Sequence, residues 1–416
     1  MSDDITTLVS RIFSGEPDHK VQSEKIKNML MEVLSSVGSS DEESISDRVN
    51  QLAAAVVNQE SISMVVSRQF VSDVVVAMEQ LPHNIVKRMA IGLLATIHSR
   101  HISYEEQAAQ LRFKLADIYE MEGENKQAAK TLMAIPLETG QRSYPADLKM
   151  RTYLRIAQLA LEYGDAADAE AFVNRASMLQ NDAKNEQLNI MYKAQYARVL
   201  DHRRKFIEAA QRYYELSLVP VLTNSEKMQA LMNAVSCAIL ASPGIQRSRM
   251  LTALFKDERC ERLPSHSVLQ KMHLERLIKH DEVSEFEKSL SAHQREVHDG
   301  CSILQRAVIE HNVIAISNIF MNISFDDLAQ LLEINVKRAE KVTWQMIAEK
   351  RINGSIDQLD RVVRFKRKDA LVEWDEQIGE LCQHVNHIVD MILDEHKEWA
   401  EQRIESSRSG TGITAS

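Results

Sequence analysis

Turn-forming residues are scarce in this chain. Its 416 residues include only 12 glycines and 7 prolines, whereas average usage would give about 50 of these two residues in a chain of this length. Aromatic residues make up 5% of the chain, and strong helix formers such as Ala, Leu, Met, Glu and Lys are abundant. The shortage argues against a turn-rich β fold. It predicts a mostly α protein of two or three domains, built from long helices joined by short links.

The sequence also lacks the motifs of common catalytic and metal sites. No phosphate loop, no H-E-x-x-H and no His-x-His occurs. Two histidine pairs have a spacing of three, but the sequence places no third ligand near either pair. These pairs are His98/His101 and His384/His387. Four cysteines are scattered without C-x-x-C spacing, at Cys237, Cys260, Cys301 and Cys382. We therefore expect no enzyme activity, no cofactor and no metal site.

Long apolar runs are missing as well. No stretch approaches the 18 consecutive apolar residues of a membrane span. The start of the chain, Met1-Ser2-Asp3-Asp4, has no basic run followed by an apolar segment, so we expect no signal peptide. The formal net charge of −10 counts against non-specific nucleic-acid binding, because phosphate contacts supply most of that affinity. These observations predict a protein of the cytoplasm and nucleus with no membrane partner.

Three segments in the first two thirds of the chain share one pattern. They are "LADIYEMEGENKQAAKTL" (115 to 132), "IAQLALEYGDAADAEAFV" (156 to 173) and "YARVLDHRRKFIEAAQRY" (196 to 213). Small residues recur where two helices would cross closely, and glycine recurs at the turn between them. The matched positions are Ala116/Ala157/Ala197, Ala128/Ala169/Ala209 and Gly123/Gly164/Arg204. The pattern resembles the tetratricopeptide helix–turn–helix unit and predicts a helical solenoid. Since Arg204 replaces the glycine, we expect the third turn to differ.

A second pattern begins near residue 324. "SFDDLAQLLEI" (324 to 334) predicts a helix with Ser324 as its N-cap. A basic helix from about Val336 to Arg351 follows, and then two strands, "GSIDQL" and "RVVRF", with Ile356, Val363 and Phe365 on the core face. Helix, helix and hairpin in this order are typical of a winged helix.

The basic helix has the wrong outer face for reading DNA. At about 100° per residue, Ala339, Val342, Met346 and Ile347 share the core face, so Trp344 points outward. Lys337, Glu340 and Arg351 are expected on the side of Trp344. Because Trp and Arg are enriched as anchors of protein interfaces, we expect protein to bury Trp344. A partner subunit is one alternative, and another segment of this chain is the other.

One long helix is predicted over about 370 to 403. From Leu371 to Ile392 the apolar spacing is 3, 4, 3, 4, 3, 4, the heptad repeat of a helix that seeks partner helices. The stripe comprises Leu371, Trp374, Ile378, Leu381, Val385, Ile388 and Ile392. We expect an intermolecular helix bundle, although such a stripe can also cover its own domain.

A helical solenoid followed by a winged helix resembles the PCI domain, which subunits of the proteasome lid, the signalosome and an initiation-factor complex share. Four segments are similar to the family of fourth subunits of the COP-nine signalosome: "RASMLQN" (175 to 181), "ARVLDHRRKFIEAAQRYYELS" (197 to 217), "QRSRMLTALFKDERC" (246 to 260) and "QRAVIEHN" (305 to 312). The resemblance covers about residues 100 to 400.

The resemblance implies a non-catalytic scaffold in the complex that removes a ubiquitin-like modifier from cullins and so regulates cullin-RING ligases. It implies other PCI subunits, a zinc-protease-type subunit and cullin-RING ligases as partners. Two alternatives stay open, a scaffold of the proteasome lid and a winged-helix nucleic-acid-binding protein.

The segments combine into one expected order of domains. Helical repeats occupy 1–100, and tetratricopeptide-like repeats occupy 101–295. The winged helix takes 296–368, the bundle helix 369–404 and a disordered tail 405–416. Within the first part, the serine-rich, acidic stretch 35 to 47 predicts a solvated loop between helices.

Overall fold

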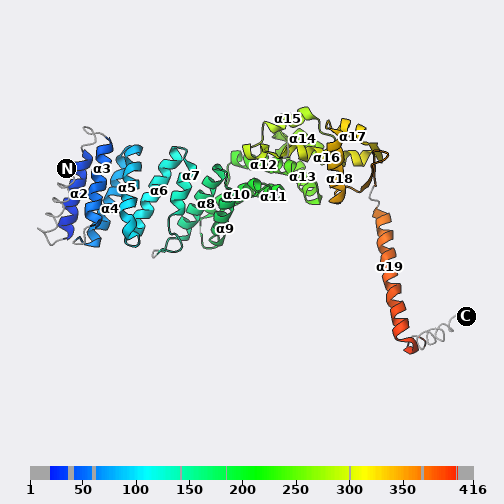
Figure 1. Ribbon diagram of the computed structural model, residues 1–416, viewed down its shortest axis with the longest axis horizontal. Helices are drawn as coiled ribbons and strands as arrows, with labels where there is room; N and C mark the ends of the chain where they lie inside the picture. The colour runs from blue at the N-terminus through cyan, green and yellow to red at the C-terminus, as the bar shows by residue number, and fades with distance from the viewer. Residues whose placement is uncertain are drawn as a thin grey trace. The chain divides into compact units, whose positions relative to one another are not determined.

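The computed structural model describes residues 19–35, 42–58, 62–140, 143–183, 185–298, 301–366, 370–399 and 401. It divides into two compact units, Met1–Ala241 and Ser242–Ser416, and helices dominate both (Figure 1). The predicted mostly α fold, a helical-repeat solenoid with a PCI domain, is confirmed. The predicted disordered tail, 405–416, lies outside the described residues.

The first unit is a stack of helices, and its described residues contain no strand. Figure 1 shows successive helices lying side by side along the unit. The α-helices are α2 (His19–Ser35), α3 (Glu42–Asn58), α4 (Met64–Ala77), α5 (His83–Ile97), α6 (Glu105–Met121), α7 (Asn125–Met133), α8 (Ala146–Glu162), α9 (Ala166–Met178), α10 (Glu186–His202), α11 (Phe206–Ser217) and α12 (Asn224–Leu240). Of the loop predicted over 35 to 47, residues 36–41 lie outside the described residues, and the remainder is wrong because α3 begins at Glu42. In α3, Ile45 and Val49 lie four residues apart on one helix face and are buried. The prediction followed the polar composition of the stretch and gave this apolar spacing too little weight.

The three predicted repeats are the helix pairs α6–α7, α8–α9 and α10–α11. All six matched alanines are fully buried, which lets the paired helices approach closely. The expected difference in the third turn is wrong, because Arg204 has the same left-handed backbone (φ 61°) as Gly123 (φ 78°) and Gly164 (φ 92°). One backbone hydrogen bond of 2.9 Å closes each turn. Its donor is the N–H of Glu124, Asp165 or Lys205, and its acceptor is the carbonyl five residues earlier. The hydrogen bonds of the turn therefore outweigh the preference for glycine.

The second unit contains the predicted winged helix. Its helices are α13 (Ile245–Phe255), α14 (His266–His273), α15 (His280–Glu287), α16 (Ile303–Ile319), α17 (Phe325–Leu331), α18 (Val336–Ala348) and α19 (Ala370–Glu395). Its strands are β1 (Val297–His298), β2 (Cys301–Ser302), β3 (Asn322–Ser324), β4 (Gly354–Asp357) and β5 (Val362–Phe365). Strands β1 and β2 form a short antiparallel pair. The sheet of the winged helix has the order β3-β5-β4, so β3 adds a third strand to the predicted hairpin.

Local chemistry accounts for the winged-helix elements. Ser324 caps α17, since its hydroxyl accepts a hydrogen bond from the backbone N–H of Asp327 at 3.1 Å. Val363 and Phe365 are buried and Ile356 packs against the same core, as the alternation predicted. Gly354 begins β4 because a Cβ there would come within 2.8 Å of the backbone oxygen of Arg364.

The last helix, α19, is shorter than predicted. It ends at Glu395, and helical conformation resumes at residues 397–399. Asp394 and Glu395 are the last two residues of its final turn, which contains no basic residue. Carboxylates are unfavourable at the negative end of the helix dipole, and this charge pattern favours an end at this point.

Candidate protein-interaction site

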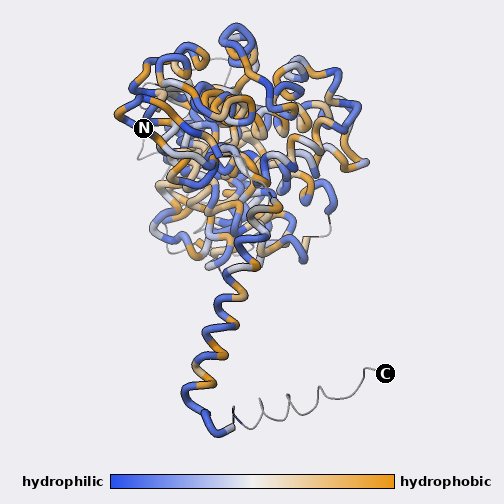
Figure 2. Tube along the Cα trace, turned by 90° about the vertical axis from the view of Figure 1, so that its right-hand side faces the viewer, coloured by the Kyte–Doolittle hydropathy of each residue, from blue (hydrophilic) through white to orange (hydrophobic). Residues whose placement is uncertain are grey.

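The heptad stripe of α19 is uncovered in the isolated chain. Its seven side chains retain between 39% (Ile392) and 75% (Leu371) of their accessible surface. Figure 2 shows hydrophobic residues recurring from turn to turn along this helix. Soluble proteins rarely expose a contiguous apolar surface of this extent without a partner. The stripe is therefore the leading candidate for an interface, and its predicted role in a bundle stays a prediction.

The apolar surface of α19 is wider than the heptad pattern indicated. Val389, Met391 and Leu393 are also exposed, and Trp399 follows the end of the helix. At about 100° per residue, Val389 lies on the stripe and Leu393 lies at its flank. The signal was present in the sequence, because residues 388 to 393 contain five apolar residues, but a strict 3,4 spacing selects only two of them.

A second exposed surface, of mixed apolar and polar character, surrounds Trp344 on α18. The side chain of Trp344 is 62% exposed and lines a shallow hollow with Glu340, Ile356 and Leu359; these four residues are called the Trp344 surface below. The alternative in which another segment of this chain buries Trp344 is contradicted by the described residues. Leu359, in the turn between β4 and β5, is 96% exposed and was missed by the sequence analysis. The sequence does indicate this residue, because an apolar side chain stands there among polar residues of a hairpin turn.

The predicted core face of α18 is confirmed, whereas one predicted neighbour of Trp344 lies elsewhere. Ala339 and Met346 are buried, and Val342 and Ile347 pack against the same core. Lys337 is exposed in the first turn of α18. Arg351 does not share the side of Trp344, because α18 ends at Ala348 and the chain turns at Lys350, where φ is 57°.

Arg351 instead joins an internal ion cluster. Its Nη1 donates to Glu310 Oε2 at 2.8 Å. Its Nε lies 2.8 Å from Glu349 Oε2 in an ion pair. Glu310 lies in α16, is buried, and also accepts from Arg306 Nε at 2.9 Å. The cluster therefore fixes the end of α18 against α16.

Two further ionisable groups are buried beside this cluster. Burial lowers the pKa of Arg247 to about 10, although the carboxylate of Glu310 opposes that shift. Burial lowers the pKa of His311 to about 4, against a backbone hydrogen bond between its Nε2 and the carbonyl of Arg276 at 2.9 Å. His311 is therefore neutral near pH 7, and the arrangement is that of a packed core rather than a proton-transfer site.

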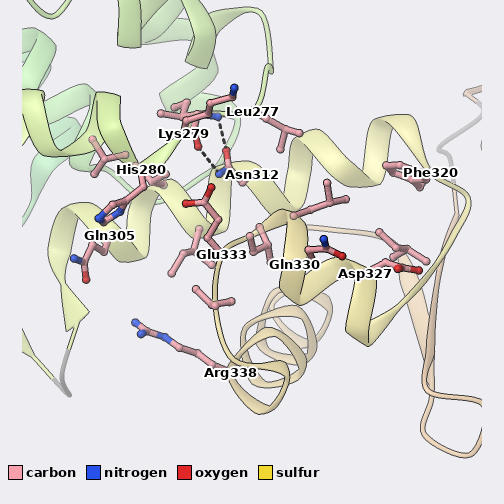
Figure 3. Close-up of a pocket in the computed structure, with 18 of the residues that line it drawn as sticks. Leu277, Lys279, His280, Gln305, Asn312, Phe320, Asp327, Gln330, Glu333 and Arg338 are labelled. Atoms are coloured by element: carbon pink, nitrogen blue, oxygen red, sulfur yellow. Dashed lines mark hydrogen bonds between the residues drawn. The ribbon is translucent and has the colours of Figure 1, made fainter.

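A groove of about 900 Å³ lies between α15, α16 and α17 (Figure 3). Asn312 lies at its upper side in the view, where its amide exchanges two 3.0 Å hydrogen bonds with the backbone of Ile278. Leu277, Phe320 and Leu331 give the groove apolar walls. Among its polar residues, Asn312, Gln305, Ser324 and Asp327 are engaged in structural hydrogen bonds. The groove therefore fits packing against another polypeptide better than catalysis.

Within the ranges that the structure describes, no three His, Cys, Asp or Glu residues come together in a group that could hold a metal ion. His98 and His101 lie in one short 3₁₀ segment with ring centroids 6.5 Å apart. His384 and His387 lie on α19. None of the described helices is long and apolar enough to cross a bilayer.

Two family models match the chain. The model "PSMD12/CSN4, N-terminal" matches residues 19–225, and the model "PCI domain" matches residues 270–367. The second range includes the groove, the ion cluster and the Trp344 surface, and it ends just before α19.

Curated relatives match nearly the whole chain. A protein named COP9 signalosome complex subunit 4 from Drosophila melanogaster is 46% identical over 384 residues, which are 92% of this chain and 93% of the relative. Proteins of the same name from Caenorhabditis elegans and Dictyostelium discoideum are 40% and 38% identical, over 94% and 91% of this chain and 97% and 95% of their own lengths. The chain carries a PCI domain over residues 270–367 and belongs to the family of COP9 signalosome complex subunit 4.

Proposed function

We propose that this chain is a non-catalytic scaffold subunit of the COP9 signalosome, the complex that removes a ubiquitin-like modifier from cullins and so regulates cullin-RING ubiquitin ligases. The name shared by relatives at 38–46% identity over most of the chain supports the complex. The observation that carries the scaffold role is the exposed stripe of α19, because a helix with this pattern needs partner helices to cover it.

The proposed partners follow from the two exposed surfaces, the stripe of α19 and the Trp344 surface. The stripe of α19 is assigned to a bundle with helices of other subunits, of both the PCI type and the zinc-protease type. The Trp344 surface, with Lys337 nearby on α18, is assigned to contact with a neighbouring subunit. The solenoid, residues 1–100 together with 101–295, is assigned to cullin-RING ligases. The winged helix predicted over 296–368 is assigned to the same arrangement, α19 (Ala370–Glu395) is assigned to the bundle, and the complex works in the cytoplasm and nucleus.

The two alternatives have weaker support. The family model for residues 19–225 names PSMD12 beside CSN4, but the relatives over the whole chain carry the signalosome name. A nucleic-acid reader would present polar and basic groups along its recognition helix. The outer face of α18 presents Trp344 beside Glu340, whose Oε1 accepts a 3.0 Å hydrogen bond from Gln358 Nε2.

Trp344→Ala is expected to weaken assembly without unfolding the chain. Because Trp344 is exposed in the isolated chain, its loss should change the free energy of unfolding by less than about 0.5 kcal/mol. At a protein interface a buried tryptophan contributes about 2 kcal/mol or more. The measurement is the yield of other signalosome subunits recovered with the tagged chain from cells, with thermal unfolding of the purified chain alongside.

The control is Ile319→Ala, which removes an apolar side chain of similar exposure (60%) from the end of α16. The recovery of partners should stay at the wild-type level in this variant. Undiminished recovery of partners with Trp344→Ala would contradict the assignment of the Trp344 surface to a subunit contact. So would duplex DNA binding by the wild-type chain that the Trp344→Ala variant has lost.

A further inference from the structure

Three basic side chains from different elements line one cleft of the second unit. Arg249 lies in α13, Lys350 follows α18, and Lys366 follows β5. They line a cleft of about 1080 Å³, called the basic cleft below. Among the described residues, none of these three side chains takes part in an ion pair.

The remaining charges of the basic cleft do not neutralise these cations. Arg351 also lines the cleft, but Glu310 and Glu349 already pair with its guanidinium. Glu275 is the one carboxylate of the lining, and it accepts a hydrogen bond from the amide of Asn318. The basic cleft therefore keeps an excess of positive charge on a chain whose formal net charge is −10.

The lining is not purely ionic. Ile245 stands at the cleft with 74% of its surface exposed, and Ile314 and Ile352 lie deeper. Ser248 and Asn353 add hydroxyl and amide groups. Cations, hydrogen-bonding groups and an exposed aliphatic side chain together match a polypeptide that carries carboxylates next to an apolar residue.

The backbone fixes the positions of both lysines. Lys350 is held at φ 57° by the turn that ends α18, which the 2.9 Å bond from Arg351 N to Met346 O closes. The N–H of Lys366 donates to the carbonyl of Asn353 at 2.8 Å. The two ammonium groups therefore project from a preorganised backbone, which lowers the cost of binding.

We propose that the basic cleft binds an acidic, extended segment of a partner protein, with carboxylates on Arg249, Lys350 and Lys366 and an apolar side chain against Ile245. Nucleic acid fits less well, because its affinity grows with the number of phosphates contacted and the cleft offers three uncompensated cations on an acidic chain. This inference does not rest on the proposed function, because it uses neither α19 nor the Trp344 surface.

The test uses the purified full chain and a fluorescein-labelled peptide, Glu-Glu-Asp-Leu-Glu-Glu, followed by fluorescence anisotropy at low salt. We expect saturable binding in the micromolar range that weakens as salt rises. The variant Lys350→Glu with Lys366→Glu should weaken binding by about tenfold or more, because it replaces two attractions with repulsions. A photo-crosslinker on the peptide should label α13 or the segment after α18.

A matched variant distinguishes the effect of the basic cleft from the effect of the total charge. Lys288→Glu with Lys341→Glu makes the same charge change at two exposed lysines of this unit outside the basic cleft, and its affinity should stay within about twofold of wild type. Equal losses in the two variants would overturn the proposal. So would the absence of saturable binding, or inorganic phosphate or a 20-base-pair DNA duplex displacing the peptide at equal concentration.

Discussion

Ile378→Asp combined with Ile388→Asp is expected to release the chain from its complex while its own fold stays intact. Both side chains lie on the α19 stripe and are about half exposed in the isolated chain. In a bundle each would lose about 1.5–3 kcal/mol of apolar burial, and each new carboxylate would add a desolvation cost. Two sites together correspond to at least a hundredfold loss of affinity, at about 1.4 kcal/mol per factor of ten.

Gel filtration of the complex from cells that express the tagged variant measures this release. The control is Gln383→Asp with His387→Asp, which puts two carboxylates on the opposite face of α19 at about 100° per residue. That variant should remain in the high-mass fractions. Retention of the Ile378/Ile388 variant in those fractions would contradict the proposed bundle.

Glu310→Ala is expected to lower the free energy of unfolding more than Trp344→Ala or Glu349→Ala. The carboxylate is buried, accepts from Arg306 and Arg351, and lies close enough to the buried Arg247 to oppose the lowering of its pKa. Breaking a buried ion pair costs up to about 3–5 kcal/mol, and this cost applies here to Arg247, which is buried and loses its opposing charge. Arg306 and Arg351 are partly exposed and recover water, so we expect a loss toward the lower end of that range. Chemical denaturation of the purified chain measures the change.

Glu349→Ala is the matched control for Glu310→Ala. Glu349 pairs with the same guanidinium of Arg351 at the same 2.8 Å, but its side chain is more exposed. Since exposed ion pairs contribute about 0.2–1 kcal/mol, this variant should be nearly as stable as wild type. Equal effects of the two substitutions would show that burial of Glu310 does not decide its contribution.

The sequence predicted correctly those features that depend on the local preference of a single residue type. Ser324 as a helix cap, the buried alanines of the repeats and the alternation of Ile356, Val363 and Phe365 are such cases. They depend on neighbours within a few positions, and the sequence displays these directly. The exposed stripe of α19 follows from the same kind of local spacing.

The features that were missed depend on residues distant in the sequence. Strand β3 has only three residues, and its pairing with β5 joins segments about 40 residues apart. Arg351 was assigned to the outer face of α18 because helical spacing cannot show that Glu310 lies against the end of that helix. The basic cleft likewise gathers cations from α13 and from the segments that follow α18 and β5, and no motif links them.

The same dependence explains the error at Arg204. A left-handed turn usually selects glycine, yet the chain bears the strain of a side chain there, at a cost of about 1–2 kcal/mol. Packing of α10 against α11 and the backbone bond from Lys205 to Leu200 fix the turn. Neither contribution is visible in the identity of residue 204.

The most direct measurement of the central claim is affinity purification of the tagged full chain from cells, with mass spectrometry of everything recovered and an assay of the eluate on modified cullin. We expect the other signalosome subunits in near-equal amounts, including the zinc-protease-type subunit. The eluate should remove the modifier from cullin, whereas the chain purified alone from a heterologous host should not. Recovery of proteasome-lid subunits instead, or removal of the modifier by the chain alone, would contradict the assignment as a non-catalytic signalosome scaffold.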